Sequence, residues 1–448
     1  MSFHTFLGAA GAVAAVGTHV VKSGEFHPWV YRLFGIAKPV YPVSGHVEPD
    51  FKDVENVFAE HFGAGREVGA SVAVFANGNR VVELYGGYAD YEKGVVYSRD
   101  TLQLVFSSSK VLESIALARL VGQGLLRYDD TVASIWPEFG VGEKGGVTVA
   151  QVMRHEAGLP YISGPKPSLD DLMTRETLAS LLARQEHLYK GKRLRCYHAM
   201  TRGWILNEII QRVDIFGRSL GQVYQQEFNS IPGVEFYLGL SEENKHRRAK
   251  WYNYPLVDVA ISASLPQSLS GPRILSDVPI EAFKPNTPIS KAVSNMFDSL
   301  DVGNKEFLAE FEIPSSNGFT SAISLATLGA HLANGGSLNG NTLIPNTCLH
   351  MAIDDPVKEY DACLYIDTIM TQAGFGIYVL DELALDTKFY GWAGMGGSAF
   401  VFNLEFNFSF AYTMNAAHST LTLSGRARTL LISAFKAHIA TIKKKINS

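Results

Sequence analysis

Residues 104–121 have the sequence LVFSSSKVLESIALARLV, which joins a serine-rich turn to an apolar helix. In its second half, apolar residues recur at mixed three- and four-residue spacing, which is typical of a helix, and Gly122 and Gly124 end it. Ser107 therefore lies at the entrance of a largely buried helix. Lys110 lies one turn later on the same face, because residues three apart are neighbours on a helix.

The pair formed by Ser107 and Lys110 is suited to nucleophilic catalysis. A serine hydroxyl attacks a carbonyl carbon efficiently only when a nearby group takes its proton. A lysine in an apolar environment loses affinity for its own proton and can take that role. Unpaired N–H groups at the start of the helix can bind an oxyanion. The alternative is a serine-rich helix cap followed by a solvated lysine, and the rest of the chain has to distinguish the two.

The composition is that of a globular protein. The 448 residues are 46% hydrophobic and 19% charged, with a formal net charge of −5, so the chain can bury a sizeable core. The chain lacks the basic excess that would indicate a nucleic-acid partner. The three cysteines, Cys196, Cys348 and Cys363, cannot all pair with one another, which argues against a disulfide scaffold. No Cys and His cluster has the spacing of metal ligands, so we predict no metal site.

The N-terminal stretch over residues 6–21 carries no formal charge and is rich in Ala, Gly and Val. It is shorter than the roughly 20 residues of a typical membrane span. We expect it to associate with a membrane, or to direct the chain to an organelle or the secretory pathway. The alternative is a small-residue helix lying on a cytoplasmic protein, since the segment has no positive n-region. The sequence gives no indication of the oligomeric state.

Strand patterns occur near both ends of the chain. Residues 70–76 and 80–85 are predicted to form a β-hairpin around Asn77-Gly78-Asn79, and residues 86–90 are expected to break its second strand. Later strands are predicted over residues 373–380, 398–402 and 408–414. These two groups of strands, with helices between them, predict one sheet built from both ends of the chain.

Helical patterns fill much of the remaining chain. Further helices are predicted over residues 51–62, 169–184, 202–213 and 421–443. Few strand patterns occur between about residues 125 and 345, which predicts a mostly helical insertion there. Residues 22–50 hold several prolines among aromatic residues and are predicted to be an extended linker.

Three motifs follow one another in a specific order. They are Phe106-Ser-Ser-Ser-Lys110, His155-Glu-Ala-Gly-Leu-Pro160 and Tyr390-Gly-Trp-Ala-Gly-Met-Gly-Gly-Ser398. This order and spacing resembles the serine β-lactamase and penicillin-binding-protein superfamily, and in particular its class C-like esterase branch. The resemblance extends over about residues 50–440.

The resemblance implies an α+β fold. Its antiparallel sheet is made from N- and C-terminal strands and flanked by helices, and the active site lies between the sheet and an inserted helical domain. We therefore expect an N-terminal hydrophobic segment and linker over residues 1–50. A β-lactamase-related catalytic domain is expected over residues 51–445, with the helical insertion at about 125–345.

The resemblance also implies roles for the first two sets of site residues. Ser107 is expected to be the acylated nucleophile and Lys110 its partner. Tyr197 matches the tyrosine of a Tyr-x-Asn motif and is expected to shuttle the proton, whereas Ala199 departs from the usual asparagine. A tyrosine with a pKa near 10 needs a cation beside it to act as a base, and Lys110 is expected to supply that charge. His198 is a rival base.

The third motif departs from the Lys-Thr-Gly of β-lactamases. Trp392 stands in the place of the lysine, so the cation that would hold a substrate carboxylate is absent. Gly394 still permits a close approach of the backbone. The N–H of Met395, with that of Ser107, is expected to form the oxyanion hole. We interpret His155 to Pro160 as a structural turn beneath the site.

The prediction is a serine hydrolase that acts through an acyl-enzyme on small-molecule esters and resembles carboxylesterases, with no cofactor. A β-lactamase or D-alanyl-peptidase is the alternative within the same class. A catalytically silent scaffold is the alternative of another class, and the departures at Ala199 and Trp392 keep it open.

Overall fold

The computed structural model describes residues 41–64, 66–253, 284–294, 302–383, 386–417, 423 and 425–447. Residues 6–21, on which the predictions of membrane association and localisation rest, lie outside these ranges. Within them, no helix is both long enough and apolar enough to cross a membrane.

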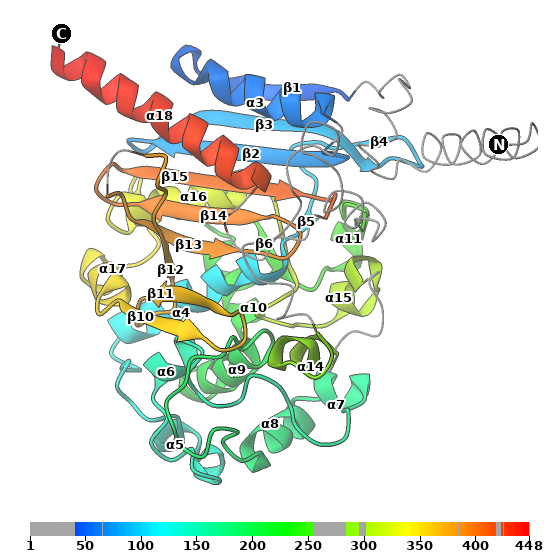
Figure 1. Ribbon diagram of the computed structural model, residues 1–448, viewed down its shortest axis with the longest axis vertical. Helices are drawn as coiled ribbons and strands as arrows, with labels where there is room; N and C mark the ends of the chain where they lie inside the picture. The colour runs from blue at the N-terminus through cyan, green and yellow to red at the C-terminus, as the bar shows by residue number, and fades with distance from the viewer. Residues whose placement is uncertain are drawn as a thin grey trace, which may run out of the picture.

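A large antiparallel sheet joins the two ends of the described chain (Figure 1). Its strands lie in the order β1-β3-β2-β15-β14-β13-β12-β11-β10. The central pairing places Ala73 of β2 opposite Ala411 of β15. The principal strands are β2 (Gly69–Ala76), β3 (Asn79–Asp90), β13 (Phe389–Ala393), β14 (Ala399–Asn403) and β15 (Phe408–Met414). The predicted α+β fold, with a sheet made from N- and C-terminal strands, is confirmed.

Helices cover both faces of this sheet. In Figure 1, α3 (Lys52–Gly63) and α18 (Gly425–Asn447) lie on the near face and α16 (Ala322–Ala333) lies on the far face. Successive strand residues point to opposite faces, so neighbouring residues of β15 reach different helices. Phe408 packs against Phe435 of α18 with ring centroids 5.2 Å apart, whereas Ser409 Oγ donates to Ala326 O of α16 at 2.8 Å.

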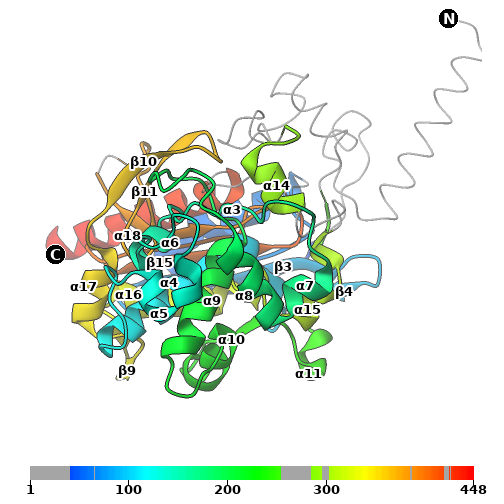
Figure 2. The same cartoon turned by 90° about the horizontal axis from the view of Figure 1, so that it is seen from below.

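A mostly helical region lies beyond the edge of the sheet at which β10 and β11 stand (Figures 1 and 2). The connection from β5 (Gln103–Leu104) to β7 (Gly318–Thr320) contains the short strand β6 (Phe236–Leu238). The described helices of this connection are α4 (Lys110–Gly122), α5 (Val132–Ile135), α6 (Val149–Met153), α7 (Leu169–Met173), α8 (Arg175–Arg184), α9 (Thr201–Val213), α10 (Leu220–Val223), α11 (Glu242–Lys245), α14 (Pro288–Ser294) and α15 (Phe307–Glu310). Because α4 contacts both β13 and α9, it lies between the sheet and the helical region.

Several predicted boundaries differ from the structure at the ends of the sheet. The strand predicted over 373–380 is short and forms only β12 (Gly376–Tyr378). The hairpin of β10 (Val357–Asp361) and β11 (Ile366–Met370), which completes this edge, was not predicted. At the other edge, β1 (Val43–Val47) falls within the predicted linker and pairs with β3. The remaining divisions into segment, domain and insertion stay predictions.

The glycine pair in β3 does not break the strand, contrary to the prediction. Gly87 has φ +76°, and a Cβ there would lie 1.9 Å from Val68 O and 2.7 Å from Phe62 Cε1. The glycine lets the strand pass close to its neighbours while Tyr88 N donates to Val68 O at 2.8 Å. The pair is therefore a point of close packing inside a continuous strand.

Replacing Gly87 by Ala should destabilise the fold more than replacing Gly94. Both glycines have left-handed φ angles, but a Cβ at Gly94 meets no atom within 4 Å. The left-handed strain, about 1 to 2 kcal/mol, is common to both. The steric clash adds about 1 to 3 kcal/mol for Gly87→Ala alone. Urea unfolding should give a lower midpoint for Gly87→Ala, and equal midpoints for the two variants would contradict this account.

Candidate active site

The serine-rich turn forms a single 3-10 turn, Phe106–Ser109, directly before α4. Phe106 has φ +43°, an uncommon value for an aromatic residue. Ser108 Oγ is buried 3.0 Å from Ser398 Oγ, and Ser109 Oγ donates to Phe106 O at 2.5 Å. Ser107 is half-buried and lines a pocket, so of these three serines, all in the described part of the chain, it is the one placed to meet a substrate.

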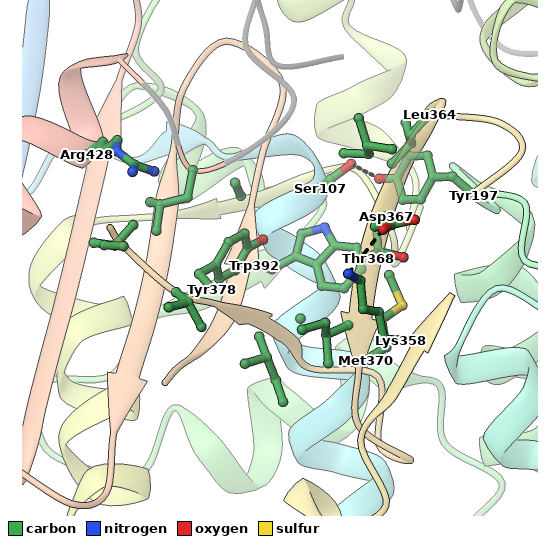
Figure 3. Close-up of a pocket in the computed structure, with 18 of the residues that line it drawn as sticks. Ser107, Tyr197, Lys358, Leu364, Asp367, Thr368, Met370, Tyr378, Trp392 and Arg428 are labelled. Carbon is green, nitrogen blue, oxygen red and sulfur yellow. Dashed lines mark hydrogen bonds and ion pairs between the residues drawn. The ribbon is translucent and has the colours of Figure 1, made fainter. Parts of the chain in front are cut away.

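Tyr197 contacts Ser107 directly. Its hydroxyl donates to Ser107 Oγ at 2.6 Å (Figure 3). Tyr197 lies in an extended segment that precedes α9 and carries no regular secondary structure. Burial raises the pKa of Tyr197 above its usual value, although the hydrogen bond to Ser107 and the charge of Arg202 oppose the rise. The phenol is therefore neutral at neutral pH.

Lys110 is completely buried behind Ser107 and Tyr197. Its Nζ donates to Ala199 O at 2.8 Å and to Ser315 O at 3.1 Å, and it lies 4.9 Å from the centroid of the Tyr197 ring. Burial lowers the pKa of Lys110 to about 7, while the charge of Glu113 opposes the fall and that of Arg202 adds to it. Two carbonyl acceptors match the two hydrogens of a neutral amine, so the lone pair of that amine stays available.

These pKa directions correct one expectation. From the resemblance, the charge of Lys110 is expected to help Tyr197 lose its proton. In the structure, burial makes the charged form of both groups unfavourable, raising one pKa and lowering the other. Near neutral pH, Lys110 rather than Tyr197 is the group that can accept a proton.

A buried ion pair supports Lys110 and was not predicted. Arg202 Nε lies 2.6 Å from Glu113 Oε2, and both side chains are fully buried. Arg202 also donates to Lys110 O at 3.2 Å, and Glu113 accepts from Ser315 Oγ at 2.6 Å. Glu113 stands out in the sequence as an acidic residue in an otherwise apolar helix, but its partner lies on α9, about 90 residues away, and no local pattern indicates it.

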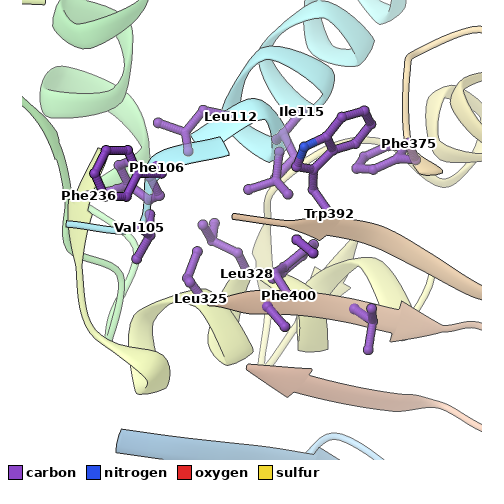
Figure 4. Close-up of a cluster of buried hydrophobic side chains, with 14 of the residues drawn as sticks. Val105, Phe106, Leu112, Ile115, Phe236, Leu325, Leu328, Phe375, Trp392 and Phe400 are labelled. Carbon is purple, nitrogen blue, oxygen red and sulfur yellow. The ribbon is translucent and has the colours of Figure 1, made fainter. Parts of the chain in front are cut away.

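Trp392 forms the wall of the pocket beside Tyr197. The two rings are stacked, with centroids 6.4 Å apart and an interplanar angle of 20°. The indole also lies in a buried apolar cluster that includes Ile115 and Phe375 (Figure 4). Arg202 Cζ lies 5.1 Å from the Trp392 ring, and its side chain is fully buried.

The chain after Trp392 lies against the Ser107 turn. Met395 lines the pocket together with Ser107, which brings the two predicted oxyanion-hole residues to one site. A Cβ at Gly394 would lie 2.1 Å from Val105 O and 3.0 Å from Ser108 N. Only glycine therefore allows β13 to end so close to the Ser107 turn.

Both histidines near the site are held by the backbone. His198 Nδ1 lies 2.6 Å from Cys196 O, and Nε2 accepts from Leu159 N at 3.1 Å, which assigns the proton to Nδ1. Burial lowers the pKa of His198 to about 3. His155, with φ +63°, accepts from His198 N at 3.0 Å through Nδ1. These bonds give both residues structural roles and leave His198 without a free nitrogen to serve Ser107.

The pocket in front of Ser107 has a volume of about 420 Å³ and is mainly apolar. Its walls come from the β10–β11 hairpin, β12 and the region around the start of α18 (Figure 3). The apolar residues that line it are Leu364, Ile366, Ile369, Met370, Ile377, Val379, Leu380, Trp392, Ala393, Met395 and Leu423. Among the residues that the structure describes, two cations also line it, and both are paired. Lys358 lies 3.1 Å from Asp367, and Arg428 lies 2.6 Å from Glu382.

A model of the family described as Beta-lactamase matches residues 54–434. The chain belongs to the Beta-lactamase family. LipL of Mycobacterium tuberculosis, named an esterase/beta-lactamase, is 29% identical over 308 residues, which cover 66% of each protein. Protein flp of Staphylococcus aureus is 25% identical over 112 residues, 24% of this chain and 22% of flp. The chain thus spans less than two-thirds of the length of these curated relatives.

Two solved structures match this chain over most of its length. A penicillin-binding protein homologue from Caulobacter crescentus has a TM-score of 0.75 and 28% identity, covering 88% of this chain and all of that one. A family VIII carboxylesterase has a TM-score of 0.77 and 25% identity, with the same coverage. The family predicted from the three motifs is confirmed.

Ser107→Ala should abolish covalent labelling by a fluorophosphonate probe. Such probes react with an activated serine, and Ser107 is the serine of the turn that contacts Tyr197 and lines the pocket. Ser108→Ala is the matched control and should keep most of the labelling, because its hydroxyl contacts Ser398 instead. Gel fluorescence after labelling checks both, and a labelled, folded Ser107→Ala protein would rule out this nucleophile.

Proposed function

We propose that this protein is a serine hydrolase of the carboxylesterase type, which cleaves small-molecule esters through an acyl-enzyme on Ser107. The observation that carries the proposal is the contact of Ser107 Oγ with Tyr197 OH at 2.6 Å, backed by the fully buried Lys110. A solvated lysine, the alternative considered from the sequence, does not fit this burial. A silent scaffold would have no need for a desolvated amine behind a serine hydroxyl.

In the proposed acylation step, Ser107 Oγ attacks the ester carbonyl carbon. Its proton passes through the Tyr197 hydroxyl toward neutral Lys110, which is the group of the site with a pKa of about 7. The backbone N–H groups of Ser107 and Met395 stabilise the oxyanion. The same proton then returns through Tyr197 to the departing alcohol, which leaves Ser107 acylated.

Deacylation repeats the sequence with water as the nucleophile. Water gives its proton to the Tyr197–Lys110 pair while its oxygen attacks the acyl carbon. The proton then returns to Ser107 Oγ, and a carboxylic acid is released. The net reaction is ester plus water to acid plus alcohol, and every proton is exchanged between groups of the protein and the reactants.

The relatives support this class of reaction. LipL is named an esterase/beta-lactamase, and one matching structure is described as a family VIII carboxylesterase. The pocket favours the ester alternative, because its lining is apolar and its two cations are already paired with carboxylates. We infer that neutral esters with apolar acyl groups are better substrates than β-lactams that bear a carboxylate.

The rate of acylation should fall as the pH decreases through about 7. Lys110 must be unprotonated to accept a proton, and its pKa, set mainly by burial and modified by Glu113 and Arg202, is about 7. The profile of kcat/KM against pH for p-nitrophenyl butyrate reports this group in the free enzyme. Hydrolysis without enzyme is subtracted at each pH.

Lys110→Ala and Tyr197→Phe separate the two roles in this profile. Each should lower kcat/KM on the order of a hundredfold or more, the usual scale of general acid–base help, and their effects should be less than additive. The inflection near pH 7 should persist in Tyr197→Phe and vanish in Lys110→Ala. An inflection retained by Lys110→Ala would assign it to another group.

The substrate preference should depend on Trp392. We expect the enzyme to prefer p-nitrophenyl butyrate over nitrocefin, because a carboxylate at this position would lack a charge-assisted partner worth about 1.5 to 3 kcal/mol. Trp392→Lys should shift the ratio of the two kcat/KM values toward nitrocefin. Trp392→Met, of similar shape to Lys but uncharged, is the control and should not. A wild-type preference for nitrocefin would favour the β-lactamase alternative instead.

A further inference from the structure

The hairpin that walls the pocket is joined to the segment that carries Tyr197. Ala362, in the turn between β10 and β11, donates its N–H to Arg195 O at 2.9 Å. The Arg195 guanidinium donates to Thr368 O of β11 at 2.8 Å and to Val357 O of β10 at 3.1 Å. Hydrogen bonds of Arg195 therefore connect the pocket wall to the Tyr197 segment.

Asp361, the last residue of β10, lies where the two segments meet. Its side chain is fully buried, and Oδ1 accepts the N–H of Tyr197 at 3.1 Å. The same oxygen accepts the N–H of Cys363 at 2.8 Å and of Leu364 at 3.0 Å. Oδ2 has no hydrogen-bond partner among the residues that the structure describes. Burying a half-satisfied carboxylate is costly, and a turn cap alone would need only the bonds to Cys363 and Leu364.

The bond to Tyr197 helps to fix a segment that belongs to no helix or strand. The amides on either side are held by one histidine, since Cys196 N donates to His155 O and His198 N donates to His155 Nδ1, both at 3.0 Å. Asp361 holds the amide between them. Asp361 also connects this amide to the pocket wall. Leu364, whose N–H donates to the same carboxylate oxygen, lines the pocket.

We propose that Asp361 is a positioning residue that holds the Tyr197 hydroxyl at Ser107 and links it to the acyl-binding wall. This proposal rests on the proposed function. The Tyr197 hydroxyl has to stay within hydrogen-bond distance of Ser107 Oγ for proton transfer. A displacement of about 1 Å by a remote substitution can cost about a hundredfold in rate. The chemistry stays with Ser107, Tyr197 and Lys110, and Asp361 acts through the backbone of Tyr197.

The test compares Asp361→Ala, which removes the acceptor, with Asp361→Asn, whose side-chain oxygen can accept the same three N–H groups. Asp361→Ala should lower the rate of fluorophosphonate labelling and the kcat for p-nitrophenyl acetate about ten- to a hundredfold, with KM changed less than about threefold. Asp361→Asn should stay within about fivefold of the unaltered enzyme. Glu359→Ala, an exposed position on the same strand, is the control and should leave both rates unchanged. If Asp361→Ala does not fold, Asp361→Val fills a similar space without an acceptor.

A double-mutant cycle distinguishes positioning from general structural support. In a Tyr197→Phe background, Asp361→Ala should change the labelling rate less than about threefold, because the hydroxyl that it positions is gone. The full loss in that background, or an Asp361→Asn enzyme as slow as Asp361→Ala, would overturn the proposal. Failure of the proposed function has a different signature, which is labelling retained by Ser107→Ala or no effect of Tyr197→Phe alone.

Discussion

The burial of Lys110 is the constraint on which the site depends. A charged ammonium group loses its hydration in the protein interior, so the neutral amine becomes the favoured form and the pKa falls to about 7. The fold supplies two backbone carbonyls, from Ala199 and Ser315, for the hydrogens of that amine. These carbonyls come from segments more than a hundred residues apart, so the amine is correctly held only once the helical region has folded around α4.

The Glu113–Arg202 pair lies beside this buried amine, and its two charges act on the pKa of Lys110 in opposite directions. An isolated charge beside Lys110 would shift its pKa strongly in one direction, whereas the pair places opposite charges together, 2.6 Å apart. Buried ion pairs contribute little net stability, because desolvation offsets their attraction, but removing one partner is costly. Arg202 also donates to Lys110 O and Met153 O, which fixes the start of α4 against the end of α6. The pair therefore serves the geometry of the site more than the stability of the fold.

Local patterns predicted the parts of the site that depend on neighbouring residues. The helix after Ser107, the β2–β3 hairpin and the strands β14 and β15 follow from periodicity and turn residues, and the three motifs predicted the family. The β10–β11 hairpin was missed although Ile366-Asp-Thr-Ile-Met370 shows some strand alternation, because short edge strands carry weak patterns. The fixation of His198, the pairing of Glu113 with Arg202 and the raised pKa of Tyr197 depend on contacts between distant segments. No local pattern records such contacts.

At the third motif, these constraints support the proposed preference for neutral esters. A cation does lie near Trp392, since Arg202 Cζ is 5.1 Å from its ring. That cation is fully buried and paired with Glu113, so it cannot meet a substrate carboxylate. Its charge instead lowers the pKa of Lys110 and opposes the rise in the pKa of Tyr197. In the proposed function, the buried charge of Arg202 therefore acts on the proton transfer, while Trp392 contributes an apolar wall to the pocket that would receive the acyl group.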